Sequence, residues 1–92
     1  MAAPLYGFAY SERALAFLQG LTPKLRRQII NKIEALASAP IPPGSKIVKG
    51  MKEGEEQVRR IRSGDNRALY IVQENQTCVV ILDIGHRKDV YR

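Results

Sequence analysis

The fold is decided by residues 57–84, which read QVRRIRSGDNRALYIVQENQTCVVILDI. Three runs rich in Val, Ile, Leu and Tyr lie within this stretch, and these residue types favour β-strands. The runs span residues 57–63, 67–74 and 77–84. The breaks between them are short and polar, Gly64-Asp65-Asn66 and Asn75-Gln76. Because short connections of this kind join neighbouring antiparallel strands, we predict an antiparallel meander of three strands.

Two helices are predicted upstream of the meander. Ser11 is suited to cap the first helix, and Gly20 can adopt the left-handed conformation that ends many helices. Thr22 then caps a second helix with Pro23 at its first position. The apolar residues of this second helix recur at intervals of three and four, and they are Leu25, Ile29, Ile33 and Leu36. We expect this stripe to be buried and the helix to end before the proline-rich residues 40–44.

The remaining segments complete an α+β arrangement. Residues 5–10 favour a strand, and residues 46–54 are basic and contain glycines, which fits a loop or a short edge strand. The predicted order is therefore strand, helix, helix and three strands, in one domain spanning residues 1–92. We predict an antiparallel sheet of four strands with the helical hairpin packed on one face. The opposite face then stays partly open for a ligand.

The charge balance indicates a polyanionic partner. The chain has 15 Lys and Arg against 9 Asp and Glu, a net charge of +6, and a pI near 9.8. RNA, DNA, a ribosome or an acidic protein segment would each match this charge, and a solvated basic surface without a ligand is the plainer interpretation. The lone cysteine, Cys78, lies in an apolar run and is expected to be a buried thiol.

Several classes of function are not expected from the residues. We find no metal-ligand spacing, no nucleotide-binding glycine loop and no Ser/His/Asp set, so neither a metal nor another cofactor is expected. No window reaches the roughly 18 apolar residues of a membrane span, and the first residues do not read as a secretion signal. A cytoplasmic protein without membrane contact is therefore expected.

Arginines concentrate around the first hairpin of the meander, at Arg59, Arg60, Arg62 and Arg67. If Arg62 and Arg67 face each other across a four-residue hairpin loop, alternation places Arg60 on their face and Ile61 on the other. Three guanidinium groups side by side repel one another, and a bound phosphate would offset that repulsion. The alternative is a solvated edge with the arginines fanning outward.

The end of the chain reads Gly85-His86-Arg87-Lys88-Asp89-Val90-Tyr91-Arg92 and directly follows the last predicted strand. Segments in this position often carry functional residues. A helical turn would place Arg87 and Tyr91 on one face, and an extended turn would bring both toward the arginine hairpin. Taken alone, Tyr91 and His86 are more often structural residues than catalytic ones.

Residues 58–70 resemble the signature hairpin of the RelE/ParE toxin superfamily, and residues 85–92 look like the ending of its RelE branch. Tyr10-Ser11-Glu12-Arg13-Ala14 and Lys49-Gly50-Met51 are similar to segments that open the first helix and precede the sheet in that family. This resemblance covers nearly the whole chain. It implies an mRNA interferase, the toxin of a type II toxin–antitoxin pair, which cuts mRNA in the ribosomal A site and assembles with its antitoxin.

The resemblance also implies roles for individual residues. Arg67 would stabilise the transition state, Arg87 would serve the leaving group, and Arg60 would support the phosphate. Tyr91 would act as a base or stack on a nucleobase, and His86 is a candidate general acid. RNA-binding positions are expected at Arg59, Arg62, Lys49, Lys52 and Lys88.

Two other functions stay open. A ParE-like toxin has the same fold and inhibits DNA gyrase by binding, without catalytic residues. A cleavage-inactive, RNA-binding relative is the third alternative. Val58 and Asn66 favour it, because they stand where relatives carry a lysine and an aromatic residue.

Overall fold

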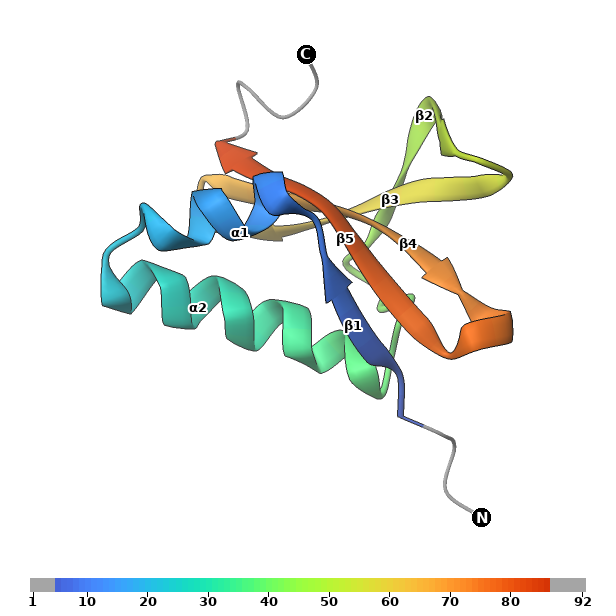
Figure 1. Cartoon of the computed structure of the whole chain (residues 1–92), viewed down its shortest axis with the longest axis horizontal. Coiled ribbons are helices and arrows are strands. Elements are labelled where there is room, and N and C mark those ends of the chain that lie inside the picture. The colour runs from blue at the N-terminus through green and yellow to red at the C-terminus, as the bar shows by residue number, and fades with distance from the viewer. Residues whose placement is uncertain (1–4, 87–92) are drawn as a thin grey trace.

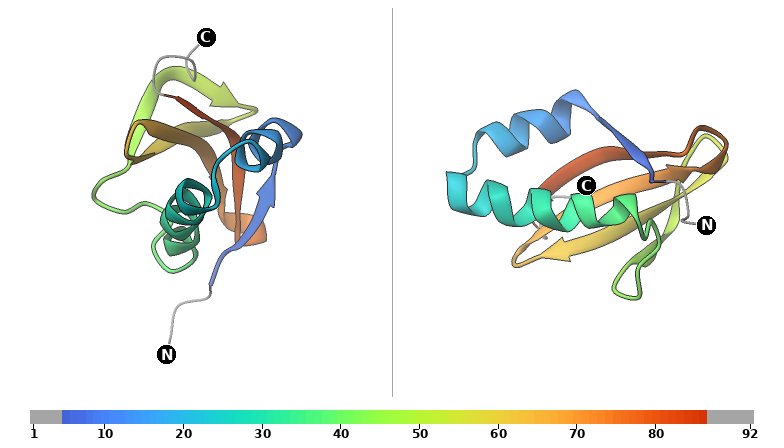
Figure 2. Two further views of the ribbon diagram at one scale, coloured as in Figure 1. Left: turned by 90° about the vertical axis from the view of Figure 1, so that its left-hand side faces the viewer. Right: turned by 90° about the horizontal axis from the view of Figure 1, so that it is seen from below.

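The computed structural model describes residues 5–86, and within them two helices lie on one side of a β-sheet (Figure 1). The helices and strands are β1 (Gly7–Tyr10), α1 (Glu12–Gln19), α2 (Pro23–Glu34), β2 (Lys46–Glu53), β3 (Glu56–Ser63), β4 (Asn66–Gln73) and β5 (Cys78–His86). Short 3-10 turns follow α2 and β4, at Ala35–Ala37 and Glu74–Gln76. Figure 2 shows the two helices side by side. Among residues 5–86, no helix is long and apolar enough to cross a membrane.

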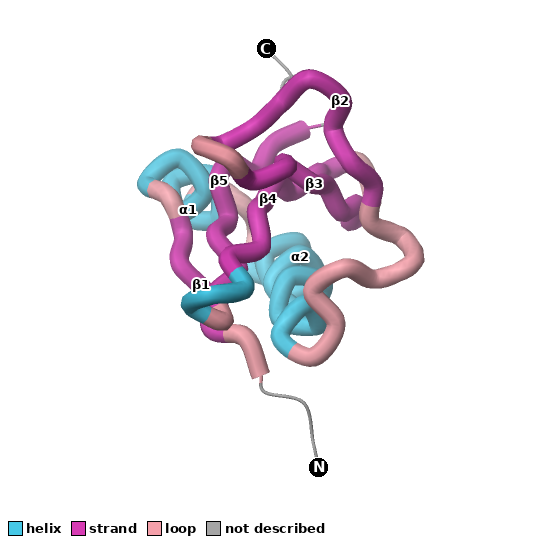
Figure 3. Tube along the Cα trace, turned by 90° about the vertical axis from the view of Figure 1, so that its right-hand side faces the viewer, coloured by secondary structure: helices cyan, strands magenta, loops and turns pink. Residues whose placement is uncertain are grey.

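The sheet has five strands in the order β1-β5-β4-β3-β2, so the prediction of four antiparallel strands was wrong in two respects. Residues 46–53 form an edge strand paired with β3, and β1 lies parallel to β5 while the other pairs are antiparallel. Figure 3 shows β2 on the side of the molecule away from α2.

The irregular backbone of β2 explains why its sequence fitted a loop as well as a short edge strand. Its pairing with β3 shifts register between Ile47 and Lys52, and Gly50 within this stretch has a φ of +77°. The side-chain amide of Gln57 donates hydrogen bonds to the carbonyls of Val48 and Met51, at 3.0 and 3.1 Å. A side chain from β3 therefore replaces the missing ladder bonds of the neighbouring edge strand.

The helix signals in the sequence hold in detail, with one exception at Gly20. Ser11 and Thr22 accept hydrogen bonds from the backbone N–H groups of Ala14 and Leu25, as N-caps do. Gly20 is not left-handed, because its φ is −82°. The guanidinium of Arg26 donates instead to the carbonyls of Leu18, Gln19 and Leu21, so a side chain of α2 satisfies the end of α1.

The main core lies between the helices and the sheet. Its buried residues are Ala14, Leu18, Ile29, Ile33, Leu36, Ile61, Ala68, Tyr70, Val72, Val79, Ile81 and Ile84. The Tyr70 hydroxyl donates to the carbonyl of Pro40 at 2.9 Å, and burial raises the pKa of this phenol above its ordinary value. The buried side chain thereby fastens the segment that leads from α2 to β2.

Two expectations about burial were wrong. Leu25 belongs to the predicted buried stripe but is 43% exposed, because the first turn of α2 extends past the strands (Figure 1). Ile29, Ile33 and Leu36 are buried as predicted. Cys78 is half-buried, because it begins β5 near the edge strand β1.

Candidate functional site

Three arginines lie on the face of the sheet opposite the helices. Arg62 pairs with Arg67 across the β3–β4 hairpin, which meets the condition set from the sequence although the loop is shorter than four residues, and Arg60 pairs with Leu69. Ile61 and Ala68 between them belong to the helix-side core, so alternation places the arginines on the other face. The strands continue to Ser63 and Asn66, and the turn is only two residues with Gly64 at a φ of +60°. This tight turn fixes the pairing of Arg62 with Arg67.

An apolar cluster adjoins the arginines and makes their face more than a solvated edge. Val58, Leu69 and Ile71 form its buried part, and the half-buried side chains of Val48 and Met51 from β2 pack against it. The face predicted to be open is thus apolar in the middle and cationic at the hairpin end. The arginines are therefore carried by strands whose neighbouring side chains on the same face are buried.

Arg67 is the most constrained of these cations. Its Nε and Nη1 atoms are buried and have no hydrogen-bond partner among residues 5–86. Within the same residues no carboxylate pairs with Arg60, Arg62 or Arg67. Burying donor atoms of a charged side chain without acceptors is costly, and a ligand that supplies the missing acceptors would offset that cost. A phosphate fits, because its oxygens accept several bonds from one guanidinium.

Lys46 is a further cation at this end that we did not select from the sequence. It pairs with Arg60 across β2 and β3. A pocket of about 120 Å³ lies here, lined by Gly44, Lys46, Arg60, Ile61 and Arg62. The sequence left residues 46–54 as either a loop or a short edge strand, and only the register of β2 pairs Lys46 with Arg60. The pocket has the size and the charge to hold one anionic group between Lys46, Arg60 and Arg62.

The other selected residues are not all brought together. Arg59 pairs with Tyr70 and lies on the helix-bearing face, where it lines a separate polar pocket of about 370 Å³ with Glu56 and Gln73. Lys49 and Lys52 are exposed on the edge strand β2. His86 ends β5 and pairs with Asn66 in the ladder, next to the pairing of Arg67 with Gly85.

Three of the selected residues, Arg87, Lys88 and Tyr91, lie outside the described residues. The strand β5 ends at His86, directly before them, on the ladder that contains Arg67. Among residues 5–86, no three His, Cys, Asp or Glu side chains gather in a way that could hold a metal ion. The chemistry available to the described site is cationic: binding phosphates and stabilising negative charge.

Comparisons with known proteins match this arrangement. Residues 8–91 fit the family model described as the ParE toxin of the type II toxin–antitoxin system parDE. A curated protein of Methanocaldococcus jannaschii, named as toxin RelE1, is 31% identical over 81 residues, which cover 88% of this chain and 89% of the relative. The chain belongs to the RelE/ParE family of toxins.

Solved RelE structures share the fold of this family member. The chain resembles the archaeal RelE–RelB complex of Pyrococcus horikoshii with a TM-score of 0.77 and 22% identity, over 94% of this chain and 99% of that one. It also resembles the RelBE2 toxin–antitoxin complex of Mycobacterium tuberculosis with a TM-score of 0.72 and 25% identity, over 90% and 99% of the two chains. The five-stranded sheet with two helices is therefore the RelE architecture.

Proposed function

We propose that this RelE/ParE-family toxin is a ribosome-dependent endoribonuclease that cleaves mRNA in the A site. The observation that carries the proposal is the half-buried Arg67, whose Nε and Nη1 atoms are buried without a hydrogen-bond partner among residues 5–86, on the same face as Arg60 and Arg62. A surface that only binds nucleic acid can leave its cations in solvent, where they are well hydrated. A preorganised, partly dehydrated donor is what stabilises charge that develops during a reaction.

The proposed reaction is an internal attack within the RNA. The ribose 2′-OH loses its proton to a base, its oxygen bonds to the adjacent phosphorus, and the bond from phosphorus to the 5′ oxygen breaks. An acid protonates that oxygen, so the products are a 2′,3′-cyclic phosphate and a free 5′-OH. Negative charge grows on the phosphate oxygens in the transition state, where Arg67 is proposed to act with Arg60 beside it.

The proton transfers are assigned to the end of the chain. Tyr91 is proposed as the base or as a stacking residue. A free tyrosine has a pKa of about 10 and is protonated at neutral pH, so a base role requires that the positive charge of the arginines favour the ionised form. Arg87 is proposed to serve the leaving group, with His86 as the alternative general acid. Arg62, Lys46, Lys49, Lys52 and Lys88 are proposed to hold flanking phosphates, and Arg59 is proposed to bind RNA from the other face.

We expect mapping of a ribosome-bound message by primer extension to show breaks within the A-site codon after the toxin is added. The breaks should carry cyclic phosphate ends, because the attacking oxygen comes from the RNA itself. A message without ribosomes is the control. Intact message on programmed ribosomes, with toxin that is folded by circular dichroism, would contradict the proposal.

An antitoxin is the second proposed partner, with a hetero-oligomer of toxin and antitoxin as the resting state in the cytoplasm. The solved relatives cited above are toxin–antitoxin complexes, and the net charge of +6 favours an acidic segment. We expect the complex to weaken as salt rises, because contacts at the rim of the arginine face are screened over about 10 Å at 0.1 M salt.

The measurement is the affinity of the purified pair between low and high salt, for the wild type and for Arg62→Ala. Arg62 is exposed at the hairpin, so its loss should reduce the salt dependence. Lys24→Ala, which removes an exposed charge on α2, is the matched control. An antitoxin that binds wholly away from Arg60, Arg62 and Arg67 would contradict this part of the proposal.

A second candidate function is inhibition of DNA gyrase by binding, and the match to the ParE family model favours it. This function involves no reaction on RNA, so the buried donors of Arg67 would then have no transition state to stabilise. Supercoiling by purified gyrase, measured with and without the toxin, separates the two. Inhibition of supercoiling together with intact message would establish the ParE-like activity.

A further inference from the structure

Strand β5 contains a β-bulge next to the arginine site. Tyr70 pairs with Ile81 and Leu69 pairs with Asp83, so Leu82 opposes no residue of β4. The extra residue reverses which face of the sheet each later side chain of β5 occupies. Ile81 and Ile84 are three residues apart, and strict alternation would separate them, yet both are buried in the helix-side core.

The bulge also decides which residue lies opposite Arg67. Beyond it, Ala68 pairs with Ile84 and Arg67 pairs with Gly85. Without the extra residue the ladder would slip by one, and Arg67 would oppose Ile84 instead. A branched side chain would then lie opposite Arg67, whereas the buried Gly85 places no side chain there. The register of the last residues of β5 is therefore a property of the site.

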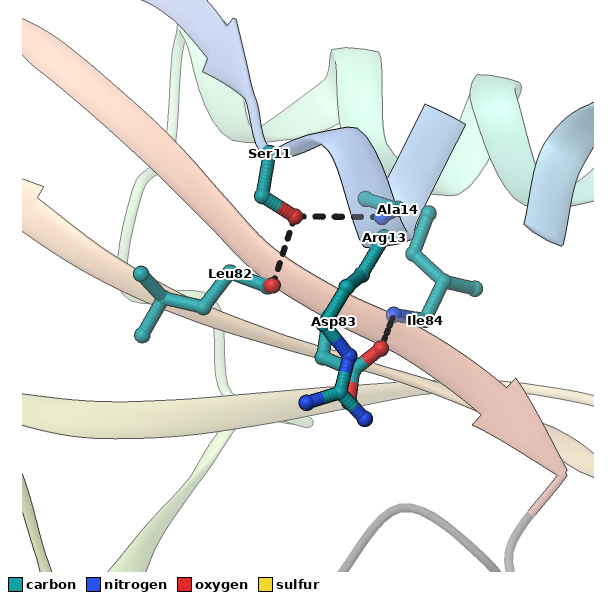
Figure 4. A network of polar contacts seen from close by, with 6 residues as sticks. All are labelled: Ser11, Arg13, Ala14, Leu82, Asp83 and Ile84. Atoms are coloured by element: carbon teal, nitrogen blue, oxygen red, sulfur yellow. Dashed lines mark hydrogen bonds and ion pairs between the residues drawn. The ribbon is translucent and has the colours of Figure 1, made fainter. Parts of the chain in front are cut away.

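Ser11, the residue between β1 and α1, contacts the bulge, as Figure 4 shows. The Ser11 hydroxyl donates to the carbonyl of Leu82 at 2.6 Å and accepts from the N–H of Ala14 at 3.0 Å. The Ser11 N–H donates to the carbonyl of Ile81 at 2.9 Å. One residue thus caps α1 and binds the carbonyl of the bulged residue, which has no partner residue in either neighbouring ladder.

Asp83 holds the other side of the bulge. Its Oδ1 accepts from the N–H of Ile84 at 2.9 Å, and its Oδ2 lies 3.4 Å from Nη2 of Arg13. The Arg13 side chain is 80% exposed and that of Asp83 is 21% exposed, so solvent weakens this ion pair. The hydroxyl contact of Ser11 is shorter and less exposed, and leaving the Leu82 carbonyl without it is the larger loss.

We propose that Ser11 is a positioning residue for the arginine site, because its hydroxyl holds the β5 bulge in the register that places Gly85 opposite Arg67. This role rests on the proposed RNA cleavage. Ser11 lies on the far side of β5 from β4 and acts through the strand, without contacting the RNA. The same hydroxyl thereby couples the start of α1 to the strand that leads into residues 87–92.

The test compares Ser11→Ala with two matched variants. Thr22→Ala also removes an N-cap hydroxyl, but among residues 5–86 the hydrogen bond of that hydroxyl is with the N–H of Leu25, on its own helix. Ser11→Thr keeps both the donor and the acceptor. Two quantities are measured for each protein: the cross-strand NOEs between Arg67 and Gly85, and the single-turnover cleavage rate on programmed ribosomes, with binding followed separately.

We expect Ser11→Ala to weaken the NOEs and to slow cleavage by about tenfold to a hundredfold with binding unchanged, because small misplacements in a site are costly. Ser11→Thr should restore both, and Thr22→Ala should lose neither. Unchanged NOEs in Ser11→Ala, or an equal rate loss in Thr22→Ala, would overturn the proposal. If the wild type cleaves no message, the proposed function fails, and the NOEs still decide whether Ser11 sets the register.

Discussion

Arg67→Ala should slow single-turnover cleavage on programmed ribosomes by about a hundredfold to a thousandfold, or roughly 2.7 to 4 kcal/mol. The reason is that Arg67 presents buried donors without partners among residues 5–86. Such donors gain most when charge appears on the phosphate oxygens in the transition state. Binding of the ribosome should change far less than the rate, because many surface cations share that task.

The controls separate catalysis from charge and from folding. Lys24→Ala removes one exposed charge from α2 and should leave the rate unchanged while slightly weakening association. Arg67→Lys keeps the charge but loses the planar fork, so an intermediate rate is expected. The thermal stability of Arg67→Ala should equal or exceed that of the wild type, since two buried donors without partners among residues 5–86 are removed. A wild-type rate in Arg67→Ala would exclude Arg67 from the chemistry.

Ile33→Ala should lower the free energy of unfolding by about 2 to 5 kcal/mol. Ile33 is 0% exposed and lies in the core between α2 and the sheet. Its truncation removes apolar surface from the core and leaves a cavity that the surrounding strands can fill only in part. Urea unfolding followed by circular dichroism measures the change.

Leu25→Ala is the matched control on the same helix. The two residues lie on one stripe of the sequence, but Leu25 is 43% exposed, so its truncation should cost well under half as much as that of Ile33. Equal losses in the two variants would contradict the packing of α2 described above. The pair therefore tests the structure where it departs from the sequence pattern.

Local signals in the sequence were sufficient for the helices and for the arginine hairpin. The caps at Ser11 and Thr22 depend on residues three positions apart, and the pairing of Arg62 with Arg67 depends on a tight turn. Because these interactions join residues that are close in the sequence, they can be predicted from the local residue types alone. Alternation likewise implied that Arg59 faces away from Arg60, although both were selected as site residues.

The tertiary structure decided between a loop and an edge strand for residues 46–53, and it alone decided the exposure of Leu25 and the surroundings of Arg67. Residues 46–53 contain charges and a glycine, and they form a strand because β3 offers an edge and Gln57 satisfies their carbonyls. The glycine opposite Arg67 follows from a bulge whose carbonyl is bound by Ser11, 71 positions earlier in the chain. The type and spacing of residues determine the periodicity of their own segment. The register between segments that are distant in the sequence depends on which residues pack together when the core is buried.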